Sequence, residues 1–367
     1  MSEYQYYEFR ALDKPLSSSQ QKSVAALSSR ARVTSRSAVF VYNYSDFCGD
    51  EMQLVSKTFD VMLYISNWGS RRLLLKLPLN LIDPDQVAEY CTVASIEHRR
   101  TANGKSLLLD FNFDTEGGGW LDGEGWLEPL LPLREMLLRR DFRPLYLAWL
   151  KAAQNAWDAE EIDESTYEPP VPAGLNKLDP ALEAWIEFLE LDQDLLSTAA
   201  VASSEPEQVD LKAWIPRLPP AEQLDFLTRL SDDEPLLSVT LNRRLAQLTG
   251  TGPASPAAPR SVADLIEVAD TLREQRHTEK QRQAVLAHQQ QLASLAKREP
   301  AIWKAVEQLI EEKKPKSYDE ALKQLKSLEQ LANHQNKLAD FRQRIDQFRQ
   351  QYPNRSALLA RLDNLKL

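Results

Sequence analysis

The sequence predicts an α+β fold: an N-terminal antiparallel or mixed sheet domain with flanking helices on one side, an all-α middle, and an elongated helical C-terminal tail. Three observations carry this prediction. Apolar residues alternate in short runs as far as about residue 115, which is the period of a strand. Beyond residue 126 they recur every three or four positions, which is the period of a helix. Asn103-Gly104, a typical hairpin turn, joins two of the alternating runs.

The first predicted strands and helices follow one another closely. Residues 4–10 and 37–44 alternate and are rich in aromatic residues, as strands often are. Between them, Ser17 and Gln20 have the spacing of a capping box, which predicts the start of a helix. Asp50 is the expected N-cap of a second, short helix.

Two hairpins complete the predicted sheet domain. The first turns at Gly69, which supplies the positive φ that such a loop needs. The second turns at Asn103-Gly104, again between alternating apolar runs. Between the hairpins, Asp83-Pro84 predicts the start of a short helix, because the first turn of a helix does not use the N–H that proline lacks.

Changes in composition divide the chain into five predicted segments. A glycine-rich run, an acidic stretch and a Gly/Pro/Ala/Ser stretch set the divisions. The segments are a sheet domain (1–115), a glycine-rich hinge (116–126), an acidic helical domain (127–248), a linker (249–261) and a helical tail with a long helix and a small bundle (262–367). Within the acidic domain, Leu224, Phe226, Leu227 and Leu230 form a stripe that we expect to face the core.

The helical tail carries its own apolar stripe. Residues 262–298 predict one long helix without an apolar seam, and Ser317 with Glu320 predicts a capping box further on. The stripe has the coiled-coil-like spacing 3, 4, 3 and consists of Leu338, Phe341, Ile345 and Phe348. Either these side chains pack inside a small helical bundle, or they line a groove for a partner helix.

Charge is distributed unevenly along the chain. The formal net charge is zero over residues 1–115, −14 over 116–260 and +4 over 261–367. An acidic middle repels phosphate backbones, so any nucleic-acid surface is expected at one end of the chain. No apolar run is long enough to span a membrane, and the N-terminus lacks the basic and apolar pattern of a secretory signal. With only two cysteines, these features favour a cytoplasmic protein.

Basic residues gather near the two predicted hairpins. If the hairpins pair, these residues form one patch that contacts phosphate or RNA, with a tryptophan as a stacking surface. The set is Trp68, Arg71, Arg72, His98, Arg99 and Arg100. The alternative is structural: arginine stems cover the apolar sheet and pair with nearby carboxylates.

Asp110, Asn112 and Asp114 alternate along one predicted strand. Period-two spacing places all three on one face, where carboxylates can hold Mg²⁺. A metal-dependent nuclease or phosphotransfer enzyme using Asp110 and Asp114 is therefore one hypothesis. The wet face of an antiparallel strand gives the same pattern. Cys48 and Cys91 are not at metal-ligand spacing, so we expect no thiolate metal site and no cofactor.

Several stretches resemble a bacterial protein family without an assigned function. They are "YYEFRALDKPL", "LSSRARVT", "YSDFCGD", "FDVMLYISNWGSRRLLLKLP" and "WIPRLPPAEQLDFLTRLSDDEP". The tail, "YDEALKQLKSLEQLANHQNKLADFRQRIDQFRQQYPNRSALLARLD", resembles the same family and is also similar to the helical C-terminal part of some bacterial SWIM zinc-finger proteins. Their zinc site needs a C-x-C pair and a later C-x-H, whereas Cys48 and Cys91 stand alone. The resemblance therefore implies a shared binding mode without a zinc site.

Taken together, the patterns favour a non-enzymatic adaptor or assembly subunit of a bacterial multi-protein system. No convergent catalytic set appears in the sequence, while the tail carries helical stripes suited to binding another protein. The expected partner is a SWIM-type zinc-finger protein or the product of a neighbouring gene. Nucleic-acid binding through the basic patch and metal-dependent catalysis are the alternatives.

Overall fold

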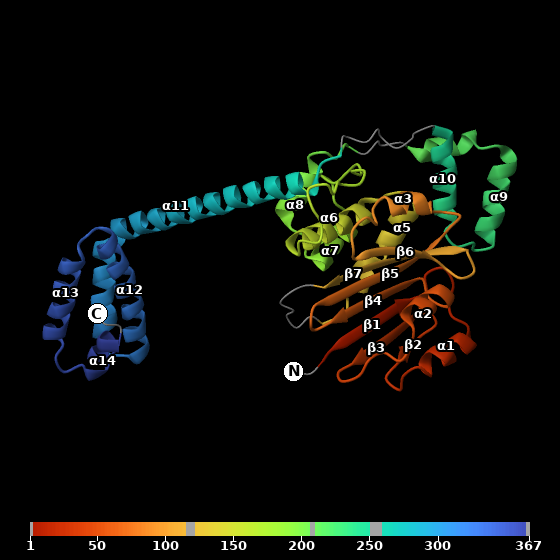
Figure 1. Cartoon of the computed structure of the whole chain (residues 1–367). Coiled ribbons are helices and arrows are strands. Elements are labelled where there is room, and N and C mark those ends of the chain that lie inside the picture. Colours follow the sequence, from red (N-terminus) through yellow and green to blue (C-terminus); the bar gives the residue numbers. More distant parts are fainter. Residues whose placement is uncertain (1–2, 115–121, 206–209, 250–258, 365–367) are drawn as a thin grey trace. The chain divides into compact units, whose positions relative to one another are not determined.

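The computed structural model describes residues 3–114, 122–205, 210–249 and 259–364 (Figure 1). The chain divides into two compact units, Met1–Arg273 and Glu274–Leu367, called here the first and second units. Among the described residues, no helix combines the length and the apolar character that crossing a membrane requires.

A seven-stranded sheet forms the centre of the first unit. Its order is β2-β3-β1-β4-β5-β7-β6, and every pairing is antiparallel, within the part of the chain described. The strands are β1 (Gln5–Arg10), β2 (Arg32–Val33), β3 (Ser37–Tyr42), β4 (Val61–Ser66), β5 (Ser70–Pro78), β6 (Ile96–Arg100) and β7 (Ser106–Asp114). The predicted α+β class is confirmed, and the sheet is antiparallel rather than mixed.

Helices cover both faces of this sheet. Those before residue 250 are α1 (Ser18–Ala25), α2 (Glu51–Lys57), α3 (Pro84–Ala88), α4 (Leu127–Leu130), α5 (Pro132–Leu138), α6 (Arg143–Asp158), α7 (Pro180–Leu189), α8 (Gln193–Ala200), the 3₁₀ helix η1 (Leu211–Arg217), α9 (Pro220–Ser231) and α10 (Leu237–Thr249). Figure 1 shows α1 and α2 on one side of the sheet and α3, α5, α6 and α7 on the other. The expectation of helices on one side only is wrong.

The reason lies in the central strands, which are apolar on both faces. Leu73, Leu74 and Leu75 follow one another on β5, and all three are fully buried. Leu74 packs in a core with α1 and α2, whereas Leu73 and Leu75 pack in the core shared with α4–α8. A strand buried on both faces reads as a continuous apolar run, and here two cores result.

Within the sheet domain, the predicted turn and cap signals are confirmed. Ser17 and Gln20 form the capping box of α1, and Asp50 caps α2. Gly69 and Gly104 both adopt positive φ, at +108° and +65°, in the two hairpin turns. These signals act over a few residues, so neighbouring sequence is enough to specify them.

The predicted hinge at 116–126 is described only from Asp122 onward, since residues 116–121 lie outside the described residues. Gly123 lies directly against β1: a Cβ atom there would come within 2.2 Å of the Tyr6 ring. Its N–H donates to the Tyr4 hydroxyl at 3.3 Å. Sheet residues before this segment and helical residues after it share one core, so the segment does not separate two cores.

The predicted linker at 249–261 is described at its two ends, Thr249 and 259–261. The Arg260 guanidinium pairs with Glu168 through two hydrogen bonds, of 2.7 and 2.9 Å, and donates to the carbonyls of Thr198 and Ala199. Glu168 also accepts from the Tyr146 hydroxyl at 2.9 Å. This cluster ties the segment just before α11 to α6 and α8 within the first unit.

The second unit is a small helical bundle. It comprises most of α11 (Val262–Glu311), which begins in the first unit, with α12 (Pro315–His334), α13 (Leu338–Gln351) and α14 (Ser356–Asn364). Trp303 lies in its core, stacked against Phe348 at a centroid distance of 5.9 Å.

Two details of the tail differ from prediction. The helix predicted over 262–298 continues through Pro300 to Glu311, because buried Trp303 packs its C-terminal part into the bundle and offsets the hydrogen bond that Pro300 removes. The capping box at Ser317 is also wrong. Proline is favoured in the first turn, so α12 begins earlier, at Pro315, and Ser317 donates to Glu312 instead.

Candidate functional site

The turn between β4 and β5 is the first candidate, because it exposes an aromatic ring. Asn67 is bound to Tyr4 in both directions: its N–H donates to the Tyr4 carbonyl and its side-chain oxygen accepts from the Tyr4 N–H. Trp68 follows at the tip and is 48% exposed. The hairpin is thus held through Asn67, while about half of Trp68 stays open to solvent.

Arg71 fixes the hairpin to the helical layer. Its side chain is buried, donates to the Phe188 carbonyl at 2.6 Å and forms an ion pair with Glu190. Phe188 belongs to α7, and Glu190 is the left-handed residue that ends this helix. Arg71 is therefore a structural bridge between β5 and the end of α7.

Arg72 is occupied by a carboxylate of the neighbouring strand. It donates to both oxygens of Asp110, at 2.8 and 2.6 Å, and these hydrogen bonds raise the pKa of Arg72. The second carboxylate of the predicted metal site, Asp114, accepts from the Ser70 hydroxyl at 2.6 Å. Across the described ranges, no three His, Cys, Asp or Glu side chains are placed to hold a metal ion. In the described part of the chain, Asp110 and Asp114 are therefore engaged by Arg72 and Ser70 and belong to no metal-binding group.

The predicted basic patch is divided between the two faces of the sheet. In the β6–β7 register, Glu97 lies opposite Asp110, and His98 opposite Leu109. Side chains alternate along a strand, so Arg99 shares the face of Glu97 and pairs with it at 2.6 Å. His98 and Arg100 belong to the other face, as Arg71 does. The six residues therefore form no continuous cationic surface.

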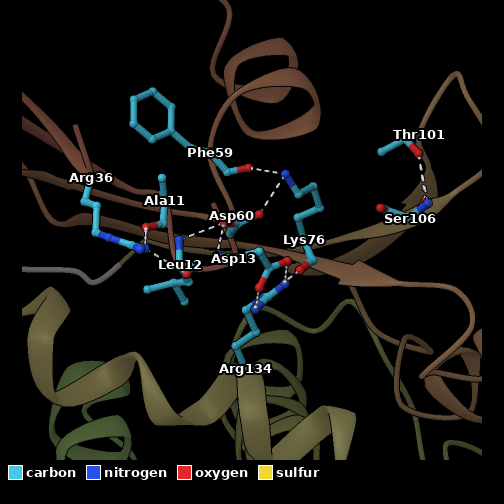
Figure 2. Close-up of polar contacts among 10 residues, drawn as sticks. All are labelled: Ala11, Leu12, Asp13, Arg36, Phe59, Asp60, Lys76, Thr101, Ser106 and Arg134. Carbon is cyan, nitrogen blue, oxygen red and sulfur yellow. Dashed lines mark hydrogen bonds and ion pairs between the residues drawn. The ribbon is translucent and has the colours of Figure 1, made fainter. Parts of the chain in front are cut away.

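A largely buried network of charges joins the loop after β1, the residue before β4, strand β5 and helix α5 (Figure 2). The Asp60 carboxylate accepts from the N–H groups of Leu12 and Asp13, at 2.7 and 3.0 Å, and pairs with the Lys76 ammonium at 2.8 Å. Arg134 donates to both Asp13 oxygens, at 2.8 and 2.7 Å, and to the Lys76 carbonyl at 2.8 Å. Sequence reasoning missed this network, since Asp13 and Arg134 are 121 residues apart.

The contacts of this network indicate that it stabilises the fold. Burial raises the pKa of Asp60, but Lys76 and the Asp13 N–H outweigh burial and hold that pKa below its usual range. Lys76 also donates to the Phe59 carbonyl at 2.6 Å. A catalytic carboxylate needs a side open to its substrate. The contacts of Asp60 are instead all made with the protein around it.

An acidic hollow of about 810 Å³ lies at the end of α6. Its lining is Trp157, Asp158, Glu160, Ile162, Asp163, Glu164 and Ser165. Asp163 is bound to the hydroxyl and N–H of Ser165, which hold its pKa below the usual range. None of these carboxylates belongs to a metal-binding group in the described part of the chain.

The predicted interaction stripe of the tail lies inside the second unit. Phe341, Ile345 and Phe348 are 5%, 1% and 4% exposed, and Leu338 packs against them half-buried. We call Phe341, Ile345 and Phe348 the α13 stripe. The sequence left two alternatives, packing inside a helical bundle or lining a groove for a partner helix. These side chains pack inside the bundle, which leaves them little exposed surface for a partner.

The stripe that we expected to face the core of the acidic domain faces solvent instead. Leu224, Leu227 and Leu230, called here the α9 stripe, are 67%, 63% and 62% exposed. Phe226 alone is half-buried, beneath the Arg229 guanidinium at 5.3 Å from the ring centre. The expectation of a core-facing stripe is wrong: α9 packs on α10, and these three leucines stay mostly exposed.

Comparison with known proteins gives no further assignment: no family model matches this chain, and neither a curated protein nor a solved structure is similar enough to match it.

Proposed function

We propose that the protein is a non-enzymatic interaction subunit that binds another protein through the α9 stripe. One observation carries the proposal: three leucines, spaced three residues apart on one helix, are each more than 60% exposed. A single exposed leucine is common in folded proteins. A contiguous row of them marks a surface where another molecule binds.

The energy available at this surface is appreciable. Complete burial of one leucine side chain contributes roughly 1.5–3 kcal/mol. Three leucines that are already about one-third covered still offer several kcal/mol on binding. This is enough to supply the apolar centre of an interface, with polar residues around its edge.

The surface proposed here differs from the one that the sequence favoured. The α13 stripe lies in the core of the second unit, whereas the α9 stripe lies on the surface of the first. A SWIM-type zinc-finger protein or the product of a neighbouring gene is still the proposed partner. Among the residues that the structure describes, nucleic-acid binding and metal-dependent catalysis have no comparable observation in their favour.

Capture of partners from extracts of the native cells tests this function. The full chain is compared with the Leu224→Ser/Leu227→Ser/Leu230→Ser variant. Val285→Ser and Leu286→Ser, at exposed apolar positions of α11, serve as the matched control. We expect at least one captured protein to be lost with the triple variant and kept with the control. Retention of every captured protein by the triple variant contradicts the proposal.

A further inference from the structure

We propose, on the basis of the function above, that the occupant of the α9 stripe is a basic amphipathic helix of the partner protein. The inference rests on the charges that surround the three leucines. Residues 219–236, which contain α9 and the turn after it, carry five carboxylates and one cation, Arg229, for a formal net charge of −4.

Arg229 is already neutralised within this segment. Its guanidinium pairs with Glu234 at 2.7 Å and approaches Asp225 at 3.3 Å. Glu222 is paired as well, with Arg244 of α10 at 2.8 Å. The negative charge left for a partner therefore lies mainly after the helix, on two exposed side chains, Asp232 and Asp233.

These two aspartates occupy a position where carboxylates are unfavourable. The last carbonyls of a helix form the negative end of its dipole, and lysine or arginine is preferred beside them. Helix α9 ends at Ser231, so Asp232 and Asp233 add negative charge to an end that is already negative. In the described part of the chain no cation forms a salt bridge with either. A basic side chain of the partner relieves this repulsion.

The spacing of the leucines indicates a helix as the occupant. A row of side chains three residues apart fits the groove between rows on a second helix, at an axial distance of about 8–10 Å. A second copy of this chain is less suitable, because it brings the same acidic segment, with Asp232 and Asp233, to the contact. A helix with leucines on one face and lysines beside them satisfies both the apolar row and the two aspartates.

Two synthetic peptides test the charge preference. Each is an amphipathic helix of about 18 residues, long enough to be helical in water, with the same row of leucines. One carries lysine and the other glutamate on its polar face. The full chain is titrated with each by fluorescence anisotropy. We expect the lysine peptide to bind at least about tenfold more tightly, a difference of about 1.4 kcal/mol. Equal affinity for the two peptides overturns the inference.

The Leu227→Asp variant separates docking from simple charge attraction. It makes the surface more acidic, so attraction by charge alone predicts tighter binding of the lysine peptide. Docking on the α9 stripe predicts the opposite, a loss of about tenfold or more, because a central leucine is replaced by a carboxylate. Val201→Asp is the matched control: it adds the same charge at an exposed apolar residue just after α8, and we expect unchanged affinity or a slight gain.

The outcomes distinguish the two proposals. If the Leu227→Asp variant binds the lysine peptide as tightly as the unsubstituted chain, the basic-helix inference is wrong. If partner capture from extracts still depends on the α9 stripe in that case, the proposed function stands with a different occupant. If capture is also independent of the stripe, both proposals are wrong.

Discussion

The α9 and α13 stripes show how one sequence pattern leads to opposite environments. Both are rows of apolar residues at helical spacing. Each lies on an amphipathic helix, of 12 residues for α9 and 14 residues for α13. In the second unit, α11, α12 and α14 contribute residues to the core around the α13 stripe. In the first unit, α9 packs on α10 and keeps its leucines exposed.

The difference identifies what helical periodicity can and cannot predict. Spacing determines which side chains share a face of a helix. It does not determine whether another element of the same chain covers that face. For α13 the covering helices are adjacent in sequence, and for α9 we propose that the cover is another protein. The following predictions test this contrast, beginning with the largest expected effect.

Truncation of a leucine or isoleucine should have very different effects on the two stripes. Ile345→Ala leaves a cavity in the core of the second unit and should lower its free energy of unfolding by about 3.5 kcal/mol. Leu227→Ala removes a side chain that is mostly in water and should change the stability of the first unit by less than about 0.5 kcal/mol. Hydrogen exchange measured by mass spectrometry reports each unit separately. Similar losses in both variants are incompatible with an open α9 stripe.

The Asp60 network should respond to substitution and to pH. Asp60→Asn leaves the Lys76 ammonium without its buried counter-charge and should cost about 3 kcal/mol at pH 7. The folded pKa of Asp60 is lowered, so its stabilising contribution is complete above the unfolded pKa, about 4, and is lost as the pH falls through the folded pKa.

Urea denaturation of both proteins measures this effect. The stability difference between the unsubstituted chain and the Asn variant should therefore shrink as the pH is lowered from 7 to below 4. A difference that stays constant over this range means that the negative charge of Asp60 does not stabilise the folded protein. Glu97→Gln, at an exposed ion pair of β6, is the control and should change stability by less than about 1 kcal/mol.

The two cysteines offer the same contrast of covered and open surface. Burial raises the pKa of Cys91 to about 12, and its thiol also donates to the Val87 carbonyl. Cys48 is exposed. At pH 8 the native protein should therefore present one reactive thiol to a disulfide reagent, with Cys91 at least about 100-fold slower. If both thiols react at equal rates in the folded protein, Cys91 lacks the partial burial that the structure gives it just after α3.

The smallest effect is expected at Trp68. Asn67 and Arg71 hold the hairpin, and the Trp68 ring is about half exposed. Trp68→Ala should change the free energy of unfolding by less than about 0.5 kcal/mol. Asn67→Ala, which removes the contact to the Tyr4 N–H, should cost about 1 kcal/mol and serves as the comparison. A larger loss from the Trp68 variant places that ring among the structural contacts of the hairpin.

Local features of the fold could be predicted from the sequence, and distant contacts could not. Ser17 and Gly69 act on residues within one turn, so their roles are readable from neighbouring sequence. The pairing of Asp13 with Arg134 depends on which elements meet in space. The prediction that the α9 leucines face the core was wrong for the same reason. Periodicity placed them correctly on one side of the helix but gave no information about what packs against that side.

Labelling of a cysteine placed in the α9 stripe tests the central claim most directly. In a Cys48→Ser background, Leu227→Cys is compared with Ile345→Cys, with and without saturating lysine peptide. We predict rapid labelling at position 227, slow labelling at 345, and marked slowing at 227 alone when the peptide is present. Slow labelling at 227 without the peptide means that the chain itself covers the stripe, and this result contradicts the account. A rate at 227 that the peptide leaves unchanged contradicts the basic-helix inference.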